Sequence, residues 1–226
     1  MVLSDSPRAY WRLGETSGTV ASDQVGSAHG QYRNGVALGA LGALFGDTNK
    51  AVRFDGNNDL VGMSDPASGV LDIGTNDATI EAWVKATAEH ERAIISKRVY
   101  FTSQPYWEVT VTDDQGHKGE AKVTVYTGSA TRSAYGPALR VDRDGWHHMV
   151  VLLDRDAGIT VYVDGLSRYT AGAFTGNLGN SGELMLGKSA NLFSPYYKGD
   201  LDEVALYGGL LTPARIQAHY TKGRNG

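Results

Sequence analysis

The 226-residue sequence has no cysteine, only 6 prolines and no long apolar run. The absence of cysteine excludes disulfide bonds and thiolate metal sites. No segment approaches the roughly 20 apolar residues that a membrane-spanning helix needs. The net charge of −4 lacks the basic excess that favours nucleic-acid binding. We therefore expect neither a nucleic-acid partner nor insertion into a membrane.

The N-terminal segment Met1–Pro7 also lacks a recognisable targeting pattern. A signal peptide needs a basic end followed by an apolar core, and neither is present. If the protein acts outside the cell, we expect it to arrive there within a longer exported protein or on a virus particle. The expected location is extracellular, on a cell surface or on a virion surface.

Glycine is abundant, with 29 residues in the chain, against the ~7% that is usual. Short runs of alternating apolar and polar residues recur between turn signals, a pattern typical of a β-sandwich or jelly roll. No convincing helical periodicity precedes Leu211, and no linker-like change of composition divides the chain. We predict an all-β fold of two antiparallel sheets in one domain, residues 1–226, with its core at about 8–222.

Local patterns predict one β-hairpin and one long connection. Ala51–Phe54 and Asp59–Met63 flank the sequence Asp55-Gly56-Asn57-Asn58, which predicts a β-hairpin. The segment Gly35–Asp47, which alternates glycine, alanine and leucine, is expected to be a long connection. No sheet position is expected for it.

The late segment Gly199–Tyr207 predicts a strand that carries two aspartates. Strand side chains alternate between faces, so Asp202 is expected on the same face as Val204 and Leu206. A carboxylate on an apolar face needs compensation. Bound Ca²⁺, a salt bridge or backbone N–H donors could each provide it.

A short C-terminal helix follows this strand. Thr212 is a suitable N-cap, and Pro213 fits the first helical position. Leu211 and Ile216 have the spacing of a hydrophobic staple. Gly223 is expected to end the helix after about two turns.

Two further segments contain candidate ligands. Glu15–Gly30 is rich in glycine, serine and threonine and contains Asp23, which fits either an ordered loop or a cation-binding loop. His147 and His148 are adjacent on a predicted strand. Their side chains should point to opposite faces, so they are expected to be structural or surface histidines that do not share an ion.

The order of several motifs resembles the laminin-G-like group of concanavalin-A-like sandwiches, in its bacterial and phage form. The matching segments are Tyr10–Leu13, Asp23–Gly30, Phe54–Gly56 with Asp59, Thr79–Lys85, Gly145–His148, Val161–Gly165, Gly199–Tyr207 and Leu211–Tyr220. The resemblance implies a jelly-roll sandwich that holds one Ca²⁺ near its rim. The implied ligands are Asp23, backbone carbonyls near Gly26 and Gly30, and Asp202.

The resemblance favours a non-catalytic, calcium-stabilised binding or adhesion module with a carbohydrate or a cell-surface protein as partner. Aromatic rings can stack on sugars. The candidate ligand-binding aromatics are Tyr100, Phe101, Tyr106, Tyr135, Phe193, Tyr196 and Tyr197. One alternative is a glycan-cleaving enzyme that uses Asp200 and Asp202, although the Glu-x-Asp-x-x-Glu string of jelly-roll glycosidases is absent. The other is a structural spacer.

Overall fold

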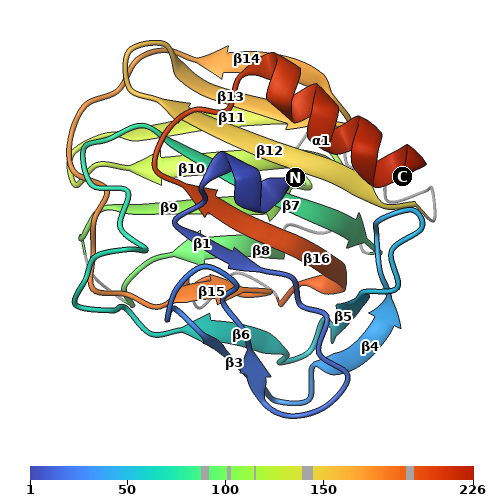
Figure 1. Cartoon of the computed structure of the whole chain (residues 1–226). Coiled ribbons are helices and arrows are strands. Elements are labelled where there is room, and N and C mark those ends of the chain that lie inside the picture. Colours follow the sequence, from blue (N-terminus) through green and yellow to red (C-terminus); the bar gives the residue numbers. More distant parts are fainter. Residues whose placement is uncertain (88–91, 101–102, 115, 139–144, 192–195) are drawn as a thin grey trace.

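The strands form two antiparallel sheets that pack face to face, with one α-helix across the outside (Figure 1). The computed structural model describes residues 1–87, 92–100, 103–114, 116–138, 145–191 and 196–226. This architecture confirms the predicted all-β jelly-roll sandwich with a C-terminal helix.

We call the sheet beneath the helix the front sheet. Its strands lie in the order β14 (Leu166–Ala171), β13 (Gly158–Val163), β12 (His147–Asp154), β7 (Ala78–Ala86), β16 (Lys198–Tyr207), β5 (Lys50–Asp55) and β4 (Ala37–Leu41). β1 (Ala9–Trp11) pairs with the second half of β16. The first and last strands of the domain are therefore hydrogen-bonded neighbours.

We call the other sheet the back sheet. Its strands lie in the order β11 (Thr131–Ala138), β10 (Glu120–Tyr126), β9 (Tyr106–Val111), β8 (Arg92–Lys97), β15 (Leu184–Leu186), β6 (Leu60–Met63), β3 (Gly30–Arg33) and β2 (Val20–Ala21). Along β9 and β10, core residues alternate with outward-facing polar or aromatic ones, which are half-buried except for the buried Thr110.

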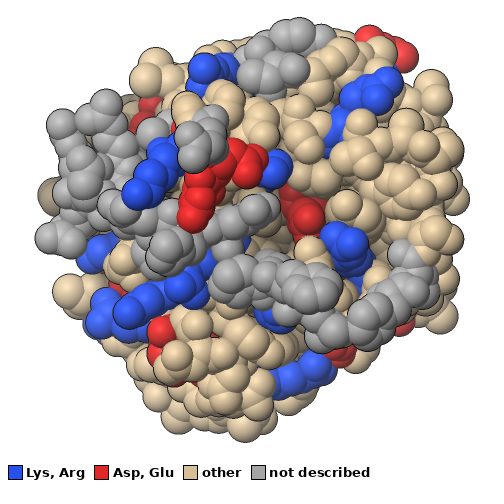
Figure 2. Space-filling model, turned by 180° about the vertical axis from the view of Figure 1, so that it is seen from behind, with Lys and Arg blue, Asp and Glu red and all other residues tan. Residues whose placement is uncertain are grey.

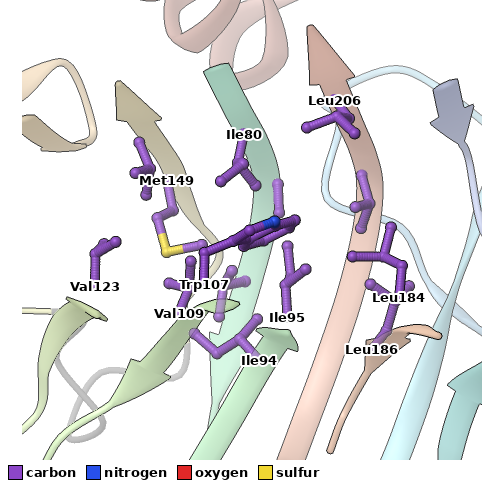
Figure 3. Packing of buried hydrophobic residues seen from close by; sticks show 14 of the residues in the cluster. Ile80, Ile94, Ile95, Trp107, Val109, Val123, Met149, Leu184, Leu186 and Leu206 are labelled. Carbon is purple, nitrogen blue, oxygen red and sulfur yellow. The ribbon is translucent and has the colours of Figure 1, made fainter. Parts of the chain in front are cut away.

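The core lies between the two sheets (Figure 3). Ile80 and Met149 of the front sheet and Trp107 of the back sheet belong to one buried cluster. Each of the three is at most 2% exposed. The burial of these large apolar side chains is the main contribution to the stability of the fold.

Helix α1 (Pro213–Asn225) packs on the outer face of the front sheet, together with the 3₁₀ helix η1 (Val2–Asp5) (Figure 1). Thr212 caps α1 by accepting the N–H of Arg215, and Leu211 and Ile216 share a second buried cluster, as predicted. The helix is longer than expected because Gly223 lies within it. A Cβ at Gly223 would come 2.2 Å from the Trp83 ring, so a close approach explains this glycine.

Two local predictions are wrong. Gly35–Asp47 contains strand β4, which pairs with β5 at the edge of the front sheet. The predicted hairpin does not form, because β5 pairs with β4 and β16 whereas β6 pairs with β3 and β15. The turn at Asp55–Asn58 instead carries the chain from one sheet to the other.

A β-bulge interrupts β16 between Asp202 and Ala205, and Glu203 adopts a positive φ of 52° there. The extra residue shifts the alternation by one position. Leu201 therefore belongs to the same core cluster as Val204 and Leu206, and Asp202 lies opposite Trp83 on β7. The expectation that Asp202 shares a face with Val204 and Leu206 is wrong for this reason.

Candidate functional site

Asp23, the first predicted calcium ligand, organises its own loop. Its Oδ1 accepts the backbone N–H groups of Tyr10 and Val25 at 3.1 and 3.0 Å, and its Oδ2 accepts that of Ala28 at 3.1 Å. Gly26 lies beside this carboxylate, since a Cβ built on it would be 3.2 Å from Oδ2. Gly30 follows at the start of β3, paired with Ala21 of β2.

Asp202, the other predicted carboxylate ligand, is 1% exposed. Its Oδ2 accepts the N–H of Ala43 at 2.8 Å, whereas its Oδ1 has no hydrogen-bond partner within the described chain. Burial raises the pKa of this carboxyl to about 7, although the Ala43 N–H and the charge of Arg12 oppose the shift. A buried carboxylate oxygen without a partner is suited to a cation.

In the described part of the chain, no hydrogen bond links the two predicted carboxylate ligands of calcium. The hydrogen-bond partners of Asp23 and those of Asp202 have no residue in common. The bare Oδ1 of Asp202 fits a hard cation, while the oxygens of Asp23 already accept three N–H groups. Calcium at these residues stays a prediction.

The two aspartates considered for glycan cleavage, Asp200 and Asp202, have different contacts. The Asp200 carboxylate forms a two-pronged salt bridge with Arg53, with N···O distances of 2.7 and 2.9 Å. The Asp202 carboxylate is instead buried and accepts the backbone N–H of Ala43. A pair that works as general acid and base needs both carboxyl groups at one substrate bond. The observed contacts do not favour that role for this pair.

The predicted aromatic residues have different surroundings. Tyr100 is 45% exposed, and Tyr106, Tyr135 and Tyr196 are half-buried. Tyr197 is fully buried and packs edge-on against Phe54, with 5.8 Å between ring centroids. Its prediction as a ligand-binding residue is wrong, because the ring belongs to the core. Phe101 and Phe193 lie outside the described residues.

Tyrosines gather on the outer face of the back sheet. Tyr106 of β9 lies opposite Tyr126 of β10, with ring centroids 5.6 Å apart. The next facing set is Glu108, Thr124 and Ser133, and the one after it is Thr110, Lys122 and Tyr135. We call these eight positions, together with Thr131 opposite Tyr126, the tyrosine face. Tyr126 was not predicted, although its place in the alternating run Glu120–Tyr126 indicates an outward side chain.

Charged groups are distributed among these rings. The Arg98 guanidinium lies 4.0 Å from the centre of the Tyr106 ring, and it also approaches Glu108 at 3.6 Å. Lys122 forms a 2.8 Å salt bridge with Asp114, whose carboxylate also accepts the Tyr135 hydroxyl. Figure 2, which views the molecule from behind, shows acidic and basic side chains interspersed on this side. Such a mixture offers both hydrogen-bond donors and acceptors.

A pocket of about 750 Å³ lies on the opposite side, between the front sheet, helix α1 and residues 44–48. Glu203 lines it and is bound by the Tyr10 hydroxyl and by Arg12, whose Nε is 2.9 Å away. Arg12 also reaches Asp47 at 2.7 Å. The charged groups of this pocket are thus largely paired with one another.

Glu81 also lines this pocket and is surrounded by polar side chains. Its Oε1 lies 2.7 Å from Nε2 of His148 and 2.8 Å from Nδ1 of His219, and its Oε2 accepts the Tyr207 hydroxyl at 2.5 Å. Burial opposes ionisation, but the hydrogen bonds and charges of the two histidines hold the pKa of Glu81 well below its usual value. The only sequence signal for this cluster was an outward Glu in an apolar strand.

The two adjacent histidines behave as expected, since they face different neighbours. His147 pairs with Asp164 at 2.7 Å, whereas His148 reaches Glu81. Among the described residues, the two rings share no hydrogen-bond partner, although Asp164 also accepts the backbone N–H of His148 at 2.9 Å.

The family model of the concanavalin A-like lectin/glucanases superfamily, Laminin_G_3, matches residues 45–217, more than half of the chain. The chain belongs to this family. The resemblance inferred from the motif order is thereby confirmed. No curated protein matches the sequence of this Laminin_G_3 domain.

Solved structures share the fold at low identity. Domain 4 of AbnA, a GH43 extracellular arabinanase from Geobacillus stearothermophilus solved with arabinotriose, is 19% identical, with a TM-score of 0.67. The match covers 94% of this chain and 97% of that one. The binding domain of Paraclostridial Mosquitocidal Protein 1 is 13% identical with a TM-score of 0.72, and the match covers 97% of this chain and 52% of that one.

The binding domain of botulinum neurotoxin DC, solved in complex with SialylT, is 10% identical with a TM-score of 0.72. That match covers 97% of this chain and 52% of the toxin domain. The chain therefore spans about half the length of these toxin binding domains. In the described part of the chain, no helix is long and apolar enough to cross a membrane.

Proposed function

We propose that this domain is a non-catalytic carbohydrate-binding module, and that the tyrosine face of the back sheet holds the glycan. The observation that carries the proposal is the Tyr106–Tyr126 pair beside Arg98 and Glu108. An aromatic ring offers an apolar face to the C–H groups of a sugar. The neighbouring guanidinium and carboxylate can then bind hydroxyl groups through charge-assisted hydrogen bonds.

The structural neighbours support the ligand class. The arabinanase domain was solved with arabinotriose, and one toxin binding domain with SialylT. Because identity is at most 19%, these likenesses argue for a fold that accommodates saccharides and leave the individual sugar open. An adhesion role, and a location outside a cell or on a virion surface, belong to the same proposal.

Calcium is proposed as a stabilising ion beside Asp202. The support is the buried Oδ1 of Asp202, which has no partner in the part of the chain that the structure describes. Ca²⁺ takes six to eight oxygen ligands, so backbone carbonyls and water would have to complete the shell. The proposed role is to hold the loops and not to react with a glycan.

A glycan array followed by calorimetry tests the carbohydrate proposal. The wild-type domain should bind at least one glycan class, and Tyr126→Ala should weaken binding at least tenfold with an unchanged melting temperature. Phe45→Ala is the matched control, because Phe45 is 67% exposed but lines the pocket beside α1. Binding only to a surface protein, or no binding to any saccharide, would contradict the proposal.

A further inference from the structure

Three side chains from distant parts of the sequence converge beneath helix α1. Glu81 comes from β7, His148 from β12 and His219 from α1. One ligand atom of each lies within 4.8 Å of those of the other two. The side chains of Glu81, His148 and His219 are 2%, 0% and 3% exposed, so bulk water is largely excluded.

The chemistry of these atoms fits a borderline-soft metal ion. Imidazole nitrogen and carboxylate oxygen are both common Zn²⁺ ligands, and two histidines with one glutamate leave a fourth position open. Both histidines direct a ring nitrogen at the same atom, Oε1 of Glu81. Harder cations such as Ca²⁺ and Mg²⁺ prefer all-oxygen sites, so they fit this cluster less well.

The distances require only a small adjustment. Two ligands at about 2.0–2.1 Å from a tetrahedral zinc ion lie roughly 3.4 Å from each other. The observed N···O distances are 2.7 and 2.8 Å. Each histidine nitrogen would thus move away from Glu81 by about 0.6 Å, which small side-chain rotations can provide.

The surroundings also resemble a metal site. A metal-bound histidine usually gives its other ring N–H to a carboxylate. Nε2 of His219 lies 2.7 Å from Oδ2 of Asp5, and Arg215 binds that same oxygen. The His148 ring is held by Trp83, with 5.1 Å between ring centroids, while its Nδ1 has no partner among the described residues.

We infer that Glu81, His148 and His219 form a binding site for a divalent transition-metal ion, with Zn²⁺ as the best match. The ion would join two strands of the front sheet to the C-terminal helix. Glu81 and His219 line the 750 Å³ pocket, so a water molecule can reach the fourth position from that side. This site is separate from the tyrosine face and does not depend on carbohydrate binding.

The competing explanation is a metal-free network in which two imidazole N–H groups share one carboxylate. Metal-stripped wild-type protein distinguishes the two. In a titration with Zn²⁺ we expect one tight equivalent and a higher melting temperature. In a titration with Co²⁺ we expect the visible absorption of a tetrahedral site. The inference is overturned if neither ion binds and the melting temperature is the same in zinc and in EDTA. This test needs no variant.

Variants then assign the ligands. Glu81→Gln and His219→Gln should each weaken zinc binding at least 100-fold, as measured by competition with a chelator. His147→Gln is the matched control, because His147 is adjacent in sequence but pairs with Asp164. It should leave zinc affinity within threefold. Equal loss in His147→Gln, or full affinity in both ligand variants, would place the ion elsewhere and contradict the inference.

Discussion

Nδ1 of His219, on the C-terminal helix, lies 2.8 Å from Oε1 of Glu81, 138 residues earlier in the chain. This contact anchors the polar side of α1 to the front sheet. The apolar side is anchored by Ile216, which lies in the cluster that also contains Tyr10 and Tyr207. The helix is thus held both by apolar burial and by a polar network.

Ile216→Ala should destabilise the domain by about 2–4 kcal/mol, because it removes a fully buried side chain and leaves a cavity beneath α1. Denaturant unfolding measures the change. Gln217→Ala, at the next and exposed position, should change stability by less than about 0.5 kcal/mol. Equal effects of the two variants would mean that α1 is not docked.

Gly223→Ala should lower the melting temperature, although alanine has the higher helix propensity by about 1 kcal/mol. The reason is the Trp83 ring, which a Cβ would meet at 2.2 Å. Thr221→Ala, at an exposed position of the same helix, should be neutral or stabilising. If Gly223→Ala raises the melting temperature, the close approach of helix and ring is contradicted.

In calcium-free buffer, the contribution of Asp202 to stability should fall as the pH rises from about 4 towards 7. The pKa of Asp202 is raised to about 7 by burial, so the folded state holds this proton more tightly than the unfolded state. The expected slope is at most about 1.4 kcal/mol per pH unit from this group. Asp202→Asn should flatten this part of the curve. An identical slope in the variant would contradict the shift.

Calcium should change this behaviour if Asp202 is a ligand. A ligand that binds only the folded state stabilises it, so millimolar Ca²⁺ should raise the wild-type melting temperature above that in EDTA. Asp202→Asn should lose most of that increase, and equimolar Mg²⁺ serves as the ion control. Equal melting of wild type and variant in Ca²⁺ and EDTA would exclude Asp202 as a calcium ligand.

Local patterns predicted the elements well where residue types alternate regularly or where a helix cap is present. The alternation of Thr79–Lys85 and the cap at Thr212 correspond to β7 and the start of α1. The pattern failed at Glu203, where a bulge changes the phase of β16. It also failed at Tyr197, because exposure of a loop aromatic depends on what packs over it.

The polar clusters were harder to predict, for a physical reason. Glu81, His148 and His219 meet only through the sheet order and the docking of α1, neither of which is encoded by nearby residues. The tyrosine face was predicted in part, since Tyr106 and Tyr135 were candidate ligand-binding residues. Tyr126 joins them through the pairing of β9 with β10.

The central claim is that the tyrosine face of the back sheet binds a saccharide. The most direct measurement is a map of backbone amide chemical shifts during titration with the best glycan from the array. The account predicts that the largest changes fall on β9 and β10, around Tyr106, Glu108 and Tyr126. Changes confined to the pocket beside α1, or none at saturating glycan, would contradict it.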